Sequence, residues 1–149
     1  ADDFPLVFVE DLLDEDDWSG YTEAVRTIRN SLMLGDDLIV TNPQRLERAV
    51  AERAVDGFIL KPNQVGTITE ALECFGYARS QQLLAIPSGR SGGVIDDVVM
   101  DLSVGLNVPF QKNGAPRSGE RIEKLNFLLR AAEQIPDCQL ADVAALARF

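Results

Sequence analysis

The feature that most constrains this chain is a unit that recurs along it: a short apolar run, a polar loop and an amphipathic segment. The apolar runs are Leu6–Val9, Leu32–Gly35, Phe58–Leu60, Leu83–Pro87 and the weaker Pro109–Gln111. Each run has the length of a strand buried on both faces. The regular alternation of strands and helices predicts an α/β protein with a parallel sheet, built from about five such units.

Local signals place the helices after the loops. Asn42-Pro43 combines a capping side chain with a proline suited to the first helical position. Thr67 and Glu70 have the spacing of a capping box. Leu38–Val40 is as apolar as Leu32–Gly35, so the pattern leaves open which of them forms the second strand. We also expect helices over about 18–30, over about 94–106 and from Ser118 onward.

Chain length limits how this sheet can close. The 149 residues are one domain's worth, whereas a closed eight-stranded barrel typically takes about 250. Five strand–helix units cannot complete such a barrel. The chain therefore forms either an open sheet or the C-terminal part of a larger barrel.

Composition excludes several classes of function. A net charge of −10 argues against nucleic acid and anionic membranes as partners. The absence of histidine removes the usual general base and the usual zinc ligand, so catalysis would depend on lysine or carboxylates. Cys74 and Cys138 have no metal-binding or redox spacing, which favours a reducing, cytoplasmic setting.

Each apolar run is followed by a residue with useful chemistry. These residues are Glu10, Asp36, Lys61, Arg90 with Ser91, and Lys112. Because the carboxyl ends of parallel strands lie at the same edge, we expect their side chains to gather there. Carboxylates suit Mg²⁺, cations suit an anionic substrate, and a Ser-Gly-Gly turn before a helix suits phosphate. Taken singly, each has an ordinary alternative as a loop acid, a helix cap or a solvated lysine.

The order of these segments and their local amino-acid sequences resemble the C-terminal part of the barrel domain of the enolase (phosphopyruvate hydratase) family. The similar segments are Val9–Asp11, Gly35–Leu38, Thr41–Pro43, Leu60–Thr67, Arg90–Gly92, Asp101–Leu106, Lys112–Pro116 and Arg121–Arg130. The resemblance implies that residues 1–149 are part of a TIM-type (β/α)8 barrel that cannot close alone. It also implies that an N-terminal domain, the first barrel strands, a third metal carboxylate and the acid glutamates lie upstream of Ala1.

The resemblance implies a role for each of these strand-end residues. Glu10 and Asp36 match carboxylates that bind Mg²⁺, and Lys61 matches the base that removes the α-proton of 2-phosphoglycerate. Arg90 and Ser91 match contacts to the substrate phosphate, and Lys112 matches a second catalytic lysine facing the substrate carboxylate. The residues that depart from the family pattern include Leu12, Gln111 and Gly89, the last standing where the family has a histidine.

Two functions follow from the resemblance. The first is the C-terminal part of a Mg²⁺-dependent glycolytic lyase that interconverts 2-phosphoglycerate and phosphoenolpyruvate, inactive as an isolated chain. The alternative, which Gly89 favours, is a non-catalytic domain that binds a phosphorylated ligand or serves assembly. In either case we expect a cytoplasmic protein that forms a homo-oligomer or pairs with its N-terminal part.

Overall fold

Four strands form one sheet in the computed structural model, which describes residues 4–148. They are β1 (Phe8–Glu10), β2 (Leu32–Gly35), β3 (Gly57–Leu60) and β4 (Leu84–Pro87). Their order across the sheet is the same as their order in the chain. β1 pairs with β2 in parallel, with Glu10 opposite Leu34, and β2 pairs with β3 in parallel, with Gly35 opposite Phe58. The predicted α/β class is confirmed, and Leu32–Gly35 rather than Leu38–Val40 forms the second strand.

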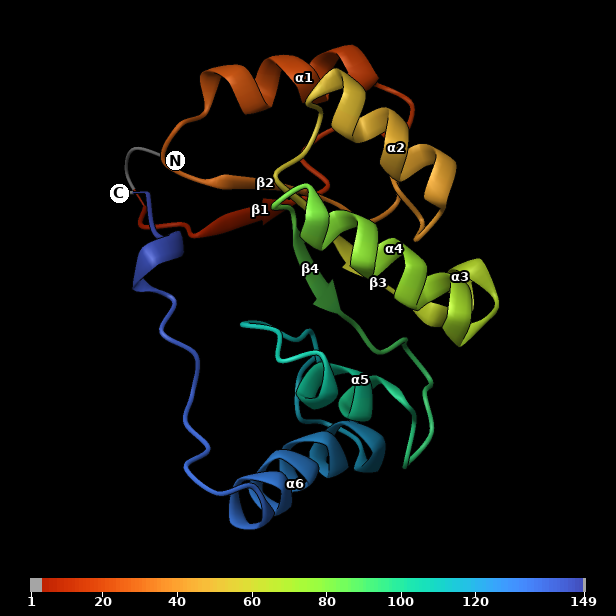
Figure 1. Ribbon diagram of the computed structural model, residues 1–149, viewed down its shortest axis with the longest axis vertical. Helices are drawn as coiled ribbons and strands as arrows, with labels where there is room; N and C mark the ends of the chain where they lie inside the picture. Colours follow the sequence, from red (N-terminus) through yellow and green to blue (C-terminus); the bar gives the residue numbers. More distant parts are fainter. Residues whose placement is uncertain (1–3, 149) are drawn as a thin grey trace. The chain divides into compact units, whose positions relative to one another are not determined.

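Helices α1 (Trp18–Thr27), α2 (Pro43–Glu52) and α4 (Ile68–Ser80) form a layer along one face of this sheet (Figure 1). Arg48 stacks on Trp18 across α1 and α2, with its guanidinium 4.1 Å from the ring centroid. Because parallel crossovers are right-handed, an unreversed strand order places all crossover helices on one face. This is the arrangement of a barrel segment, in which the helices lie outside the strands.

The expected caps define the starts of two helices. Asn42 caps α2 by accepting the backbone N–H of Arg45 at 2.9 Å, and Pro43 is its first residue. Thr67 caps α4 by accepting the N–H of Glu70 at 3.2 Å, while its hydroxyl bonds the Glu70 carboxylate. The loop between β3 and α4 contains an additional short helix, α3 (Pro62–Val65).

The core of the sheet lies between its strands and the helix layer. Its fully buried side chains include Tyr21, Leu34, Leu46, Phe58 and Leu60. The apolar Leu38 and Ile39 are also fully buried, although they lie in the turn after β2 rather than in a strand. The burial of Leu38 and Ile39 anchors the turn that carries Asp36 and Thr41.

The chain divides into two compact units. The first unit runs to Ala85 and also includes the C-terminal residues from Val143 on. These residues contain a 3-10 turn, η1 (Ala144–Leu146). Arg148, which follows this turn, forms an ion pair with Asp56 at 3.1 Å. The second is Ile86–Asp142 and contains α5 (Val99–Gly105) and α6 (Gly119–Gln134). None of the helices within residues 4–148 is long and apolar enough to cross a membrane.

Two expectations about the second unit need correction. The helix predicted over 94–106 begins only at Val99, because Asp96 has a left-handed backbone (φ 62°) that interrupts a right-handed helix. The weak strand at Pro109–Gln111 is reduced to one parallel bridge between Ser88 and Lys112. Pro109 has no N–H to donate to a neighbouring strand, which disfavours a longer ladder.

Candidate active site

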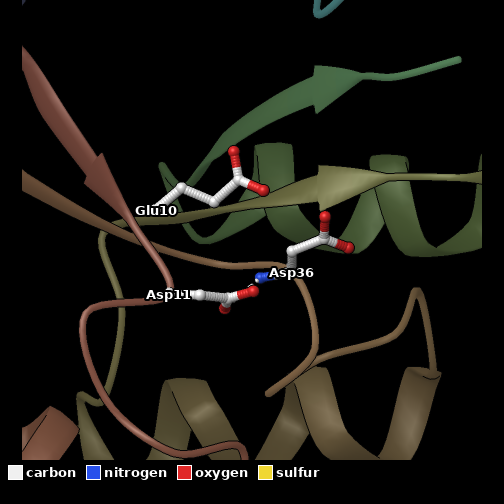
Figure 2. A group of neighbouring side chains, drawn as sticks. All are labelled: Glu10, Asp11 and Asp36. Carbon is white, nitrogen blue, oxygen red and sulfur yellow. Dashed lines mark hydrogen bonds between the residues drawn. The ribbon is translucent and has the colours of Figure 1, made fainter. Parts of the chain in front are cut away.

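The carboxyl edge of the first unit brings three carboxylates together. Glu10 ends β1, Asp11 follows it, and Asp36 follows β2. Oxygen atoms from these three side chains lie within 4.8 Å of one another, and the Glu10 and Asp36 side chains extend to the same side (Figure 2). The parallel register explains this, since the ends of β1 and β2 are adjacent across the sheet. Carboxylate oxygens are the donors that Mg²⁺ prefers, so the chemistry of this set fits that ion.

Asp11 has a different task from its neighbours. One of its carboxylate oxygens accepts the backbone N–H of Asp36 at 2.8 Å (Figure 2). The other accepts the backbone N–H of Asp37 at 3.1 Å. The Tyr21 hydroxyl donates to the Leu13 carbonyl at 3.0 Å and lies 3.3 Å from the same carboxylate. Burial, followed by the Asp11 charge, raises the pKa of Tyr21 to about 12, so this hydroxyl stays a donor. Asp11 therefore positions the turn that carries Asp36.

Lys61 lies at the end of β3, and its ammonium donates to the Asp36 carboxylate. The side chains of Lys61 and Asp36 are only 11% and 5% exposed. Two opposite charges with so little access to water stabilise each other, and removing either would leave an uncompensated charge. The structure thus brings together three of the residues predicted from the sequence: Glu10, Asp36 and Lys61.

Thr41 and Gln64 hold this pair in place. The Thr41 hydroxyl accepts the backbone N–H of Lys61 at 2.9 Å and lies 2.9 Å from the side-chain oxygen of Gln64. The Gln64 amide in turn donates to the second oxygen of Asp36 at 3.3 Å. Both oxygens of Asp36 are therefore contacted, one by an ammonium and one by an amide.

The turn that presents Thr41 is strained. Val40 and Thr41 have φ angles of 46° and 51°, a left-handed conformation that β-branched residues rarely adopt. The fully buried Thr41 hydroxyl and its bond to the Lys61 backbone help to compensate this strain. Strained backbone that the surrounding structure maintains is common at functional sites.

The second unit carries the remaining predicted residues. Main-chain bonds fix the strand end, since Lys112 donates to the Pro87 carbonyl at 2.9 Å and Gly89 donates to the Lys112 carbonyl at 3.2 Å. The side chains of Arg90, Ser91 and Lys112 are all exposed. Cationic and hydroxyl groups in such positions can contact an anion arriving from solution.

Residues 1–145 match the family model of the enolase C-terminal TIM barrel domain. The chain belongs to the enolase family. It is 45% identical over 130 residues to the enolase of Aeropyrum pernix and 41% identical over 129 residues to that of Metallosphaera sedula. These alignments cover 87% of this chain but 30% and 31% of the two relatives, so the chain spans about a third of their length.

Family membership confirms the resemblance read from the sequence, and the open four-stranded sheet is consistent with a partial TIM barrel. The enolase-family roles assigned to Glu10, Asp36, Lys61, Arg90, Ser91 and Lys112 remain predictions. The sequence had also singled out the segments that contain Asp11, Thr41 and Gln64, but gave these residues no role. The available signal was their position inside loop segments that match the family pattern, because binding and catalytic residues often lie on loops.

Proposed function

We propose that this chain forms the C-terminal part of an enolase-type lyase that interconverts 2-phosphoglycerate and phosphoenolpyruvate. The observation that carries the proposal is the buried pair of Lys61 and Asp36, which lies beside Glu10 at the carboxyl edge of the sheet. The burial and ion pair of Lys61 do not match the alternative interpretation as a solvated surface lysine. They suit a lysine that takes part in proton transfer. Similarity to two enolases supports the same reaction class.

In this proposal Lys61 accepts the proton from C2 of 2-phosphoglycerate. To do so it must first give up a proton and its bond to Asp36. Thr41 fixes the backbone of Lys61 by accepting its N–H, which limits the lysine to side-chain motion. Such restriction favours proton transfer because the amine is kept within reach of one carbon atom. Loss of the C3 hydroxyl, protonated as water, then completes the double bond of phosphoenolpyruvate.

Glu10 and Asp36 are the side chains that would hold Mg²⁺. When bound, this ion supplies positive charge that stabilises the negative charge developing on the substrate carboxylate. Asp11 contributes by holding the N–H groups of Asp36 and Asp37, which fixes the direction of the Asp36 side chain. The chain's own part in metal binding would therefore be two carboxylate ligands, Glu10 and Asp36, and a third carboxylate, Asp11, that orients Asp36.

Arg90, Ser91 and Lys112 would contact the anionic groups of the substrate. By family resemblance, Arg90 and Ser91 face the phosphate, and Lys112 faces the carboxylate as the second catalytic lysine. Their exposure in the second unit supports a binding role because the substrate reaches them from solution. A guanidinium matches a phosphate with two parallel hydrogen bonds, which gives orientation as well as affinity.

The acid that protonates the leaving hydroxyl and a third metal carboxylate have no counterpart among the matched residues. We assign them to other segments of the enolase fold, with which this chain would assemble. The active protein would then be a homo-oligomer, or a complex of this chain with those other segments.

The test measures formation of phosphoenolpyruvate from 2-phosphoglycerate by its rising ultraviolet absorbance. The protein that contains this chain together with the upstream enolase segments should show turnover that chelation abolishes and Mg²⁺ restores. The chain of residues 1–149 alone should show none. Absence of turnover in the complete protein would reject the proposed reaction, and turnover by residues 1–149 alone would reject the incomplete site.

Gly89 favours a second candidate, a non-catalytic enolase-like domain that binds a phosphorylated ligand. The family has a histidine at this position, and a glycine supplies no side-chain chemistry. The two candidates differ in one measurement. The lyase exchanges the C2 proton of 2-phosphoglycerate with solvent, whereas the non-catalytic domain binds the compound and leaves that proton in place.

A further inference from the structure

The loop that carries Arg90 and Ser91 has both of its ends against one buried ammonium. We call residues 89–97 the Arg90 loop; it joins β4 to α5 within the second unit. Lys124, from the middle of α6, is only 4% exposed. Gly89 at one end of the loop and Asp97 at the other are both close to its side chain.

At the Asp97 end, the contact is an ion pair. The Lys124 ammonium lies 2.7 Å from one carboxylate oxygen of Asp97. The other oxygen of Asp97 accepts the backbone N–H of Val99 at 3.0 Å, at the start of α5. A single lysine therefore ties α6 to the end of the Arg90 loop and to the helix that follows it.

At the Gly89 end, the contact depends on the absence of a side chain. A Cβ atom placed on Gly89 would come closer than 3.0 Å to the Lys124 ammonium and would lie 3.9 Å from the Asp97 carboxylate. Real Cβ atoms do not approach other atoms this closely, so the end of the lysine would have to shift. The flexible side chain can move at little cost by itself, but the shift disturbs its ion pair with Asp97. The ammonium thus fills the space that a side chain at position 89 would need.

The surrounding charges make this lysine hard to replace. It lines a cavity of about 210 Å³ together with Asp96, Asp97, Asp101, Glu120 and Glu123. Among these lining residues Lys124 is the cation, although Glu123 also pairs with Arg130 on α6. Without the ammonium, Asp97 would share this cavity with four other carboxylates and no cation among the lining residues, and like charges in a partly buried place repel each other. The end of the Arg90 loop would then separate from α6.

We infer that Lys124 is a positioning residue that closes the Arg90 loop, and that Gly89 leaves open the space into which its ammonium extends. The effect of Lys124 on substrate binding rests on the proposed function of Arg90 and Ser91. The pairing makes a clear prediction about coupling. Gly89→Ala and Lys124→Met both break the same contact, so their effects should not add.

The first experiment is hydrogen exchange, followed by mass spectrometry, on the protein that contains this chain. Gly89→Ala, Lys124→Met and Asp97→Asn should each speed exchange in the Arg90 loop at least tenfold, and the double variant of positions 89 and 124 should match Lys124→Met. Gly105→Ala is the control, because a Cβ there meets nothing within 4 Å. Continued protection of β2 shows that each variant has folded. Unchanged loop exchange in the folded Asp97 and Lys124 variants would overturn the inference.

The second experiment separates loop position from general damage. With 2-phosphoglycerate as the substrate, Gly89→Ala should raise the KM about tenfold and change the kcat less than twofold, because it disturbs binding rather than proton transfer. In the Lys124→Met background the same substitution should leave the KM within a factor of two. Independent, multiplying effects would overturn the coupling. If the unmodified protein has no such activity, the proposed reaction fails, while hydrogen exchange still decides the role of Lys124.

Discussion

The two units carry their predicted functional residues in opposite ways. In the first, Asp36 and Lys61 are buried and bonded to each other. In the second, Arg90, Ser91 and Lys112 are exposed, and the buried charge is that of Lys124, which pairs with the partly buried Asp97. The contrast suits two kinds of work. Metal binding and proton transfer need side chains fixed in one direction, whereas an anion from solution needs donors that it can reach.

The largest expected difference between the units concerns proton exchange. Lys61→Ala in the protein containing this chain should abolish exchange of the C2 proton of 2-phosphoglycerate, measured by NMR in deuterated water. Arg90→Ala should raise the KM but leave exchange at saturating substrate within about tenfold, since it removes binding rather than the base. Lys61→Arg is the matched control, because it keeps the charge but cannot accept the proton. Exchange that survives in both Lys61 variants would remove Lys61 as the base.

Within this chain, metal affinity should come from the first unit rather than from the second. Asp36→Asn removes a ligand charge and leaves the Lys61 ammonium without its carboxylate, so Mg²⁺ affinity measured by calorimetry should fall at least 100-fold. Stability should fall by about 3–5 kcal/mol, the usual cost of breaking a buried ion pair. The exposed neighbour Asp37 provides the control, since Asp37→Asn should change neither quantity much. Equal effects at both positions would contradict the assignment.

Substitutions at Thr41, in the strained turn of the first unit, should change stability more than a substitution at the exposed Ser91 of the second unit. Thr41→Val keeps the shape of the side chain but leaves the buried N–H of Lys61 without its acceptor, which should cost about 1–3 kcal/mol in the free energy of unfolding. Thr41→Ser retains the hydroxyl and should recover most of that loss. In the second unit, Ser91→Ala should change stability by less than about 0.5 kcal/mol because Ser91 is exposed. Chemical denaturation of the four proteins tests this ordering.

Alkaline pH should give the smallest of these effects, and it too separates the units. Burial, with help from Glu73 and Glu70, raises the pKa of the Cys74 thiol from 9.0 to about 11. A raised pKa means that folding favours the neutral thiol. Its contribution to stability is therefore complete below about pH 9 and is lost as the pH rises to about 11.

The melting temperature should accordingly fall by a few degrees over that range. Cys74→Ala should make the fall shallower, although the similarly raised pKa of Tyr21 adds to it at the upper end. Cys138→Ala, at an exposed cysteine of the second unit, is the control and should leave the pH profile unchanged. Identical profiles for both cysteine variants would show that the Cys74 thiol does not drive the alkaline loss.

Much of the fold could be predicted because its signals are local. The capping residues Asn42 and Thr67 start helices as expected, since a side-chain oxygen bonds an N–H only a few residues away. The second unit was predicted less well. The helix expected from residue 94 starts at Val99, because the left-handed backbone at Asp96 has no clear sequence signal.

The candidate site shows the same division. Glu10, Asp36 and Lys61 could be named from the sequence because each follows an apolar run, and parallel strands bring such ends together. The roles of Asp11, Thr41 and Gln64 could not be named. They depend on bonds between residues 20 to 28 positions apart and on a left-handed turn at Val40 and Thr41.

The sequence by itself determined the alternation of strands and helices, the charge at each strand end and the family. These follow from short-range hydrophobic periodicity, capping and residue order. Only the tertiary structure decided that Lys61 pairs with Asp36, that Asp11 orients the turn, and that Lys124 fills the space beside Gly89. Such choices depend on sheet register and on which side chains share one buried volume, and local sequence specifies neither.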